Sequence, residues 1–328
     1  MKITVILCTY NRCRGLAKAL DSIAASELPS TVEWEVLVVD NHSNDQTREV
    51  VEDFCRRYPD RFRYAFEAKR GLSHARNAGI RQARGDVVAF TDDDLTVEPT
   101  WLWNLVRALG NGEWAGAGGR IWPAESFLVP RWLALDGPYG MGGVLYAHFD
   151  LGDKPHELDR PPHGANMAFR KVVFEKCGDF RADLGPSPGN EIRNDDTEFG
   201  RRVMAAGGRL RYEPSAVVYH EIPVDRIRKD YFLKWWFDYG RAQMRETGKR
   251  PGIWGIPRQY ISIPNLVLSH LPRRTLHWIV TLNPQKRFYR RCMVQVVVGW
   301  LVETRRLLSS WKSTPAPSTQ NRKGEELT

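Results

Sequence analysis

The sequence lacks an apolar run long enough to cross a lipid bilayer, which takes about 20 residues in a helix. The longest candidate, CMVQVVVGWLV at 292–302, has only 11 residues. The apolar run in the opening MKITVILCTYNR leads straight into polar residues without a small-residue cleavage site, so we read it as a first strand and not as a secretion signal. These features predict a cytoplasmic protein.

Cysteine is scarce and carries no metal-binding pattern. The five cysteines are an odd number and none stands in the paired spacing of a zinc site. We therefore expect free thiols in a reducing compartment. Apolar residues at 42 % and charged residues at 27 % are ordinary for a globular protein with a sizeable core.

Positive charge is concentrated at one end of the chain. The formal net charge is +9, but residues 221–328 hold 20 Lys and Arg against 8 Asp and Glu, whereas residues 1–220 hold 28 against 31. The two parts are therefore expected to present different surfaces to different partners.

Short apolar runs alternate with helical patterns over residues 1–110. Strands are predicted at 3–8, 34–40, 61–66 and 86–91, and helices at 14–26, 43–58 and 73–84. This alternation predicts an α/β fold with a mostly parallel sheet flanked by helices. The polar clusters CTYNR, DNHSND and TDDD all follow strands, so they should meet in one crevice at the carboxyl ends of the strands.

The pattern changes twice after residue 110. Residues 111–225 are rich in Gly, Pro and Trp and predict antiparallel strands and long loops, with strands at 163–171 and 216–222 and a helix at 194–208. Residues 226–312 predict a basic, aromatic helical extension, and residues 313–328 a disordered tail. Within the extension, Gln295, Gly299, Glu303 and Arg306 form one narrow polar stripe at helical spacing.

Three adjacent carboxylates follow the fourth predicted strand. On an extended chain Asp92 and Asp94 point the same way and Asp93 the other. Asp92 and Asp94 suit Mg²⁺ or Mn²⁺, which prefer oxygen ligands and share them with substrate phosphates. The alternative is an acidic turn that caps the helix after Pro99. Mutual repulsion of the three charges favours a bound cation.

Two other polar stretches suit a nucleotide. Asp40, at the end of the second strand, can accept hydrogen bonds from a base or ribose, or it can cap the next helix. Arg70 and Arg76 can meet phosphate oxygens, or they can lie on a solvated helix face.

These stretches together resemble the family 2 glycosyltransferases. The motifs that carry the resemblance, in order and at similar spacing over roughly residues 1–225, are ILCTYNR, VVDNHSND, GLSHARNAGI, AFTDDD and DDTEFGRR. The resemblance implies a GT-A fold and the transfer of a sugar from a nucleotide donor with inversion at the anomeric carbon. Among the nucleotides, UDP is favoured.

The resemblance also implies roles for individual residues. The residues expected in the nucleotide-sugar pocket, with Arg70 and Asp93 added from the same stretches, are Thr9, Tyr10, Arg12, Asp40, Arg70, Arg76, Asn77, Asp92 and Asp93. Asp94, Asp92 and His220 are the implied metal ligands, for Mg²⁺ or Mn²⁺. Asp196 matches the family's catalytic base. Because Asp195 stands where Glu is more usual, the choice between the two carboxylates stays open.

The basic extension suggests contact with an anionic membrane. Trp235, Trp236, Phe237 and Tyr239 lie among Arg228, Lys229 and Lys234, as in an interfacial helix. The alternative is a helical appendage that packs on the catalytic domain. A glycan or lipid-linked acceptor would make membrane docking useful, and the acidic cleft argues against nucleic acid.

Two other functions are left open. A nucleotidyltransferase would want a Gly-rich, Lys-bearing phosphate loop near the N-terminus, which LCTYNRCRGLAKAL does not provide. A non-catalytic protein binding anionic lipid or nucleic acid would have no need of the carboxylates at 92–94 and 195–196.

Overall fold

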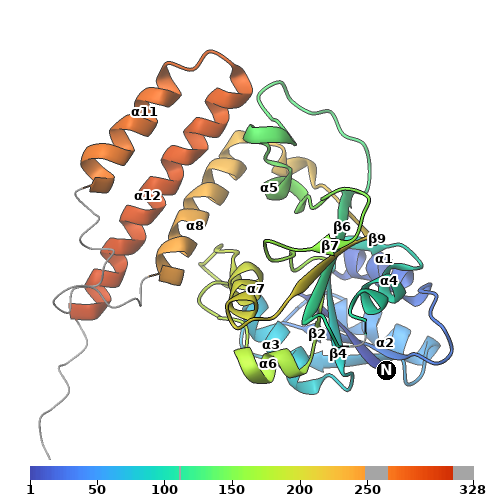
Figure 1. Cartoon of the computed structure of the whole chain (residues 1–328). Coiled ribbons are helices and arrows are strands. Elements are labelled where there is room, and N and C mark those ends of the chain that lie inside the picture. Colours follow the sequence, from blue (N-terminus) through green and yellow to red (C-terminus); the bar gives the residue numbers. More distant parts are fainter. Residues whose placement is uncertain (111, 248–264, 313–328) are drawn as a thin grey trace, which may run out of the picture.

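The computed structural model describes residues 1–110, 112–247 and 265–312, and Figure 1 shows them as a mixed sheet with helices on its faces and a separate layer of long helices at one side. The predicted tail at 313–328 lies outside the described residues. The sheet has nine strands, and its main path runs β3-β2-β1-β4-β8-β6-β9-β5, with β7 paired to β9.

The first half of the sheet is wholly parallel. Its elements are β1 (Lys2–Thr9), α1 (Cys13–Ala24), β2 (Glu33–Asp40), α2 (Thr47–Arg57), β3 (Phe62–Phe66), α3 (Leu72–Gln82) and β4 (Val87–Asp92). Strands β3, β2, β1 and β4 are parallel neighbours, so their carboxyl ends meet at one edge. The alternation read from the sequence is confirmed here, to within a few residues at each element.

The second half is mixed in direction. Its elements are β5 (Leu95–Val97), α4 (Trp101–Ala108), β6 (Gly116–Pro123), η1 (Gly137–Tyr139), α5 (Gly142–Tyr146), β7 (His156–Glu157), β8 (Met167–Arg170), α6 (Val172–Cys177), α7 (Asp195–Ala205), β9 (Leu210–His220) and η2 (Val224–Arg226). Strand β8 runs antiparallel to both β4 and β6 and joins the two halves into one sheet. Because β4 and β8 share a ladder, residues from both halves can line the same crevice.

A cluster of phenylalanines fixes helix α7 against the sheet. Phe199 of α7 is fully buried and stacks on Phe174 of α6, with ring centroids 4.5 Å apart. Phe169 of β8 meets Phe199 edge to face at 5.1 Å. Full burial of each such ring stabilises the fold by about 1.5–3 kcal/mol. The amino end of α7, with Asp195 and Asp196, is thereby held at the edge where β4 ends.

The C-terminal extension is a layer of helices: α8 (Lys229–Thr247), the π-helical turn η4 (Leu266–His270), α11 (Leu271–Ile279) and α12 (Pro284–Lys312). Helix α12 packs against both α8 and α11, and Figure 1 shows α11 as the outermost of the three. A Cβ added at Gly240 of α8 or Gly299 of α12 would overlap the backbone of the other helix, so the two helices approach closely.

Buried charges join this layer internally and to the rest of the chain. Glu303 of α12 is 1 % exposed and pairs with Arg241 at 2.9 Å and Arg245 at 2.7 Å, both on α8. Arg245 also donates to the carbonyl oxygen of Asp183 at 2.7 Å. Helix α8 is therefore fixed relative to the loop that precedes α7. Among the described residues no helix is both long and apolar enough to cross a membrane.

Candidate active site

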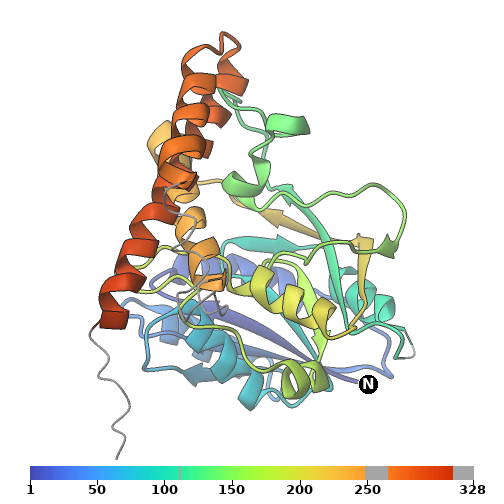
Figure 2. The same cartoon turned by 60° about the vertical axis from the view of Figure 1, so that its left-hand side comes forward.

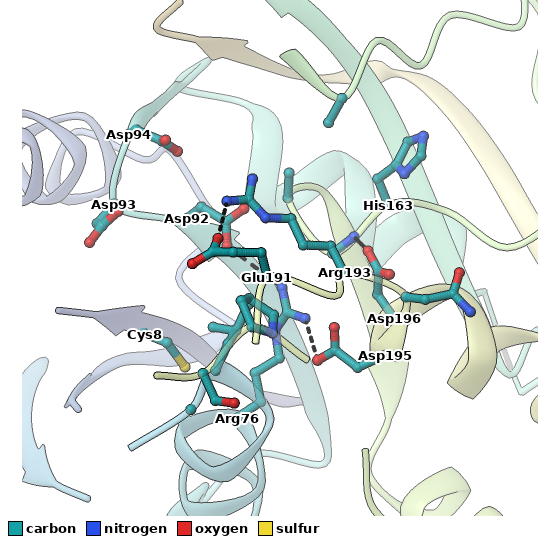
Figure 3. Close-up of a pocket in the computed structure, with 18 of the residues that line it drawn as sticks. Cys8, Arg76, Asp92, Asp93, Asp94, His163, Glu191, Arg193, Asp195 and Asp196 are labelled. Atoms are coloured by element: carbon teal, nitrogen blue, oxygen red, sulfur yellow. Dashed lines mark hydrogen bonds and ion pairs between the residues drawn. The ribbon is translucent and has the colours of Figure 1, made fainter. Parts of the chain in front are cut away.

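The polar clusters at the carboxyl ends of the strands line one cleft of about 670 Å³, as the sequence predicts. Eleven of the thirteen predicted site residues line it: Thr9, Tyr10, Arg12, Arg70, Arg76, Asp92, Asp93, Asp94, Asp195, Asp196 and His220. Figure 3 shows the carboxylates in two groups, Asp92 to Asp94 on one side and Asp195 with Asp196 on the other, with Arg76 between them.

Asp40 and Asn77 do not line this cleft. Asp40 is buried and accepts hydrogen bonds from the Ser43 N–H at 2.8 Å and the Tyr64 hydroxyl at 2.9 Å. The Asn77 side chain bonds both the N–H and the carbonyl oxygen of Phe180. Both side chains have local partners that a buried polar group needs.

Asn41, the neighbour of Asp40, lines the cleft instead. Its Oδ1 accepts the N–H of Gly71 at 2.6 Å, and its Nδ2 donates to the carbonyl oxygens of Glu67 and Lys69. Asn41 thus shapes the loop that leads to Arg70, whose guanidinium contacts the Tyr10 ring and hydroxyl at the cleft wall. No pattern in the sequence favours Asn41 over Asp40.

Two arginines from distant segments of the chain lie beside the carboxylates after β4. Arg12 lies 2.6 Å from Asp94 and 3.2 Å from Asp93, and Arg226 lies 3.5 Å from Asp94. The sequence suggests that the three carboxylates repel one another unless a cation from outside the protein is bound. In the structure the two guanidiniums offset part of that repulsion. These guanidiniums also give the cleft cations that suit phosphate oxygens.

Asp93 differs from its two neighbours in its surroundings. Its Oδ2 accepts a hydrogen bond from the Thr9 hydroxyl at 2.7 Å, and the residue is buried at 6 % exposure. Burial raises the pKa of Asp93 to about 7, although Arg12 opposes the rise. Asp93 therefore supports the turn between β4 and β5 from behind, while Asp92 and Asp94 lie nearer the open cleft.

Asp94 and His220 lie close together and are candidate ligands for a divalent cation. Nδ1 of His220 donates to the carbonyl oxygen of Glu221 at 2.6 Å, which directs Nε2 toward Asp94, 3.7 Å from its Oδ1. Such a backbone partner is typical of metal-ligating histidines. Burial works against ionisation of Asp94, but His220, Arg12 and Arg226 outweigh it and lower its pKa. The carboxylate is therefore charged at neutral pH.

The number of ligands also fits Mg²⁺ or Mn²⁺. No group of three or more His, Cys, Asp or Glu side chains in the described residues is arranged to hold a metal ion. These ions are commonly held by one or two protein ligands, with substrate phosphates and water completing the shell. Asp94 and His220, with Asp92 beside them, suit that mode, in which the substrate supplies the remaining oxygens.

Arg76 connects the two groups of carboxylates. It is 4 % exposed and lies 3.0 Å from Asp195 and 3.7 Å from Asp92. A Cβ at position 164 would overlap its guanidinium, so Gly164 leaves the room that Arg76 occupies. Cys8 also lines the cleft here, but burial raises its pKa to about 12, so it stays a thiol and is no nucleophile.

The two adjacent carboxylates at the start of α7 have different partners. Asp195 is 2 % exposed, and its Oδ2 is taken by Arg76 and by the Ser73 hydroxyl at 2.9 Å. Asp196 is more open, and the N–H groups of Gly164 at 2.6 Å and Thr197 at 2.7 Å fix its carboxylate.

The surroundings also separate the pKa values of the pair. Burial raises the pKa of Asp195, and Arg76 only partly offsets it. Burial opposes ionisation of Asp196 too, but the charge of Arg76 and the two backbone N–H groups outweigh it and lower the pKa of Asp196. Asp196 is thus the ionised carboxylate with access to the cleft.

Helix α8 contributes a wall that the sequence did not indicate. Tyr231, Trp235 and Tyr239 line the same cleft, and the rings of Trp235 and Tyr239 stack at 5.5 Å with an interplanar angle of 10°. Glu246, at the end of α8, bonds Arg201 and Asn194 of α7 and its cap. The sequence leaves open whether Trp235 and Tyr239 meet a membrane or pack on the catalytic domain, because nothing in the local pattern shows that α8 returns to the catalytic edge.

Comparison with known proteins places these features in a family. The family model described as glycosyl transferase family 2 matches residues 4–178. The chain is 28 % identical over 249 residues to the succinoglycan biosynthesis protein ExoM of Rhizobium meliloti, covering 75 % of each chain. It is 28 % identical to the glucosyl-dolichyl phosphate glucuronosyltransferase of Haloferax volcanii, covering 74 % of this chain and 77 % of the other.

Solved structures support the fold. The mannosyltransferase PcManGT of Pyrobaculum calidifontis, solved with GDP-mannose and Mn²⁺, aligns with a TM-score of 0.59 at 19 % identity over 95 % of this chain and 88 % of the other. GalNAc-T7, solved with UDP, GalNAc and Mn²⁺, aligns with a TM-score of 0.57 at 15 % identity over 94 % of this chain and 57 % of the other. At these identities the likeness shows the fold alone, which is GT-A.

Proposed function

Since the chain belongs to glycosyltransferase family 2 and is a glycosyltransferase, we propose that it moves a sugar from a UDP-sugar to a hydroxyl group with inversion. The observation that carries the proposal is Asp196, an ionised carboxylate fixed by two backbone N–H groups and open to the cleft that also holds Asp92 and Asp94. Family membership removes the reason for a nucleotidyltransferase or a non-catalytic binding protein.

The donor lies on the side of the cleft formed by β1, β4 and α3. Asp94 and His220, with Asp92, would hold Mg²⁺ or Mn²⁺, which when bound offsets the charge that develops on a leaving diphosphate. Arg12 and Arg226 would contact phosphate oxygens. Thr9, Tyr10 and Arg70 line the part of the cleft left for the nucleoside. Asp40 and Asn77 would not touch the donor, but they would hold the loops that line this side of the cleft.

The acceptor hydroxyl loses its proton to Asp196. A hydroxyl is a weak nucleophile at neutral pH, and a carboxylate within hydrogen-bond reach takes its proton as the new bond forms. Attack from the face opposite the leaving group gives inversion in one displacement, by the same logic that links carboxylate placement to stereochemistry in glycoside hydrolysis. Asp195 is a positioning residue in this proposal: it holds Arg76 between the two groups of carboxylates.

The acceptor is proposed to be a lipid-linked or cell-envelope glycan. The relatives named above are a polysaccharide biosynthesis protein and a transferase acting on a glucosyl-dolichyl phosphate. Trp235 and Tyr239 offer a flat aromatic surface in the cleft, on which a sugar ring of the acceptor would stack. We also propose peripheral contact with an anionic membrane at its cytoplasmic face, and no nucleic acid partner.

A screen of nucleotide-sugars with Mn²⁺ tests the proposal. The expected result is release of the nucleoside diphosphate and a higher melting temperature with a UDP-sugar, and a smaller effect with other nucleotides. The Asp196→Asn variant is the control, since it should keep the melting shift and lose turnover. Absence of both turnover and protection with every donor would refute the proposed reaction.

A further inference from the structure

The hairpin formed by η4, α11 and α12 carries an unusual surface at the edge of the molecule. Helix α12 lies between α11 and α8, so one face of α11 is covered by α12 and the other meets no described element (Figure 1). Figure 2 shows α12 standing along one side of the molecule, away from the sheet. Residues 266–282 were not singled out by the sequence, which directed attention to the aromatics of α8.

Large apolar side chains are exposed along this hairpin. None of the residues of α11 is buried. The exposed fractions are 77 % for Leu268, 59 % for Leu276, 58 % for Ile279, 60 % for Val280 and 93 % for Leu282. Leu276, Ile279 and Val280 stand at the spacing of one helix face. A contiguous exposed apolar face of this kind marks an interaction site.

The charge of the hairpin has a single sign. Residues 266–302 contain six Lys and Arg and no Asp or Glu. None of these six forms an ion pair with any residue that the structure describes. The contrast with α8 is clear, because there Arg241 and Arg245 are both neutralised by Glu303.

A groove between α11 and α12 is lined by three of these six cations. It has a volume of about 480 Å³, and its lining includes His270, Arg273, Arg274, His277 and Arg290 without any carboxylate. Arg274 is half-buried and donates only to the carbonyl oxygen of Met293 within the described residues, and its guanidinium lies 5.7 Å from the Trp300 ring. A cation withdrawn from water without a carboxylate partner favours a bound anion.

From this combination we propose that the α11–α12 hairpin docks the protein onto an anionic phospholipid membrane. Leu268, Leu276, Ile279, Val280 and Leu282 enter the boundary between headgroups and acyl chains, and the Arg-lined groove takes lipid phosphates. Mixed apolar and cationic faces are typical of interfacial helices.

Charge complementarity decides the occupant. A second copy of the chain docked by a two-fold axis would bring six unpaired cations against six others, which is unfavourable. A nucleic acid backbone would match the charges but leave the five aliphatic side chains in water. An anionic lipid surface satisfies both features. The inference deepens the proposed membrane contact, and it stands whichever donor or acceptor the enzyme uses.

The location also connects the membrane with the cleft. Helix α12, whose other side packs on α8, separates α11 from the helix that carries Trp235 and Tyr239. A membrane bound at α11 therefore lies one helix layer from the proposed acceptor wall. A lipid-linked acceptor would reach the cleft without leaving that surface.

Flotation of the full chain with vesicles tests the proposal. The wild type should float with vesicles of phosphatidylcholine and phosphatidylglycerol and stay at the bottom with phosphatidylcholine alone, and raised salt should reduce the floating fraction. Leu276→Asp combined with Ile279→Asp, and separately Arg273→Glu combined with Arg287→Glu, should each lower the bound fraction at least tenfold. Matched controls are Val172→Asp and Lys176→Glu on α6, where both wild-type side chains are exposed.

Measurements of turnover and of the oligomeric state in solution complete the test. Hydrolysis of the nucleotide-sugar without vesicles should be unchanged in the hairpin variants, which separates failed docking from a failed fold or a wrong reaction. Wild-type protein that stays at the bottom with anionic vesicles would overturn the proposal, as would equal binding to neutral vesicles. A dimer that the hairpin variants abolish, without any vesicle binding, would assign the surface to self-association instead.

Discussion

Nη1 of Arg76 lies 3.0 Å from Oδ2 of Asp195, and both side chains are almost fully buried. This ion pair separates the roles of two adjacent carboxylates, between which the sequence favours Asp196 as the base but leaves the choice open. Asp195 is committed to holding a cation, whereas Asp196 is held by backbone N–H groups that leave it open to the cleft. A buried pair of this kind is strongly destabilised when one partner is removed.

Asp196→Asn is expected to abolish transfer and leave the binding of UDP near normal. The amide keeps the shape but cannot accept the acceptor proton, so kcat should fall by about 10²–10⁴-fold. Steady-state kinetics and a UDP titration measure the two effects. Equal losses of transfer and of UDP binding would make Asp196 a structural residue.

Asp195→Asn is the matched comparison at the neighbouring position. It removes the nearer of the two carboxylates beside buried Arg76, so the free energy of unfolding should fall by about 3–5 kcal/mol. Denaturant unfolding of the two variants distinguishes the roles. An equal loss of stability in Asp196→Asn and Asp195→Asn would argue against different roles for the two carboxylates.

Trp235→Ala is expected to weaken binding of the acceptor and to leave binding of the donor unchanged. The ring forms part of the cleft wall with Tyr239. If stacking on a sugar is similar in strength to stacking between aromatic rings, its loss should reduce the free energy of acceptor binding by about 0.5–1.5 kcal/mol. The KM for the acceptor that supports turnover should therefore rise by up to about tenfold. Donor hydrolysis in the absence of acceptor should not change.

Trp34→Ala is the control for that variant, because Trp34 is part-buried like Trp235 but does not line the cleft and packs beside Arg61. It should leave the acceptor KM unchanged whatever it does to the melting temperature. A rise in KM that is the same for both tryptophans would place the acceptor elsewhere.

Glu303→Gln is expected to loosen α8 from α12 in a pH-dependent way. Burial works against the charged form, but Arg245 and Arg241 outweigh it and lower the pKa of Glu303 below the ordinary value of 4.5. The unfolded chain therefore binds this proton more readily than the folded one, so the stabilisation is present above pH 4.5 and is lost as the pH falls through the folded pKa.

The free energy of unfolding should fall by about 3–5 kcal/mol in Glu303→Gln near pH 7 and by much less in acid. Denaturant unfolding at a series of pH values measures this difference. Glu52→Gln, in an exposed pair with Arg48, should cost less than about 1 kcal/mol. A loss in Glu303→Gln that does not change with pH would mean that its charge is not what holds the helices.

The sequence predicts those features of the fold and site that depend on local contacts along the chain. The parallel half was predictable because each strand, helix and terminal polar cluster is written in consecutive residues, as in the stretch that ends at Asp92. The contrast between Asp195 and Asp196 was not, since it depends on where Arg76 lies, more than a hundred residues earlier. The same holds for Arg12 and Arg226, which reach Asp94 from opposite ends of the domain.

The C-terminal layer was the least predictable part. Glu303 reads as a member of a polar stripe on a helix surface, yet it is buried because two glycines bring α8 and α12 into contact around it. That packing directs Trp235 and Tyr239 into the cleft and leaves α11 at the outer edge. Helical periodicity alone cannot show which of several amphipathic helices keeps a solvent-facing side.

The proposed reaction requires that a divalent cation and a diphosphate complete the site beside Asp94. Calorimetric titration of UDP, with Mn²⁺ and then with a chelator, tests this most directly in the wild type, in Asp94→Asn and in the exposed control Asp53→Asn. We predict UDP binding that needs Mn²⁺ in the wild type and control, and that weakens at least tenfold in Asp94→Asn. Equal UDP affinity with and without the metal, or an Asp94→Asn variant that binds like the wild type, would contradict it.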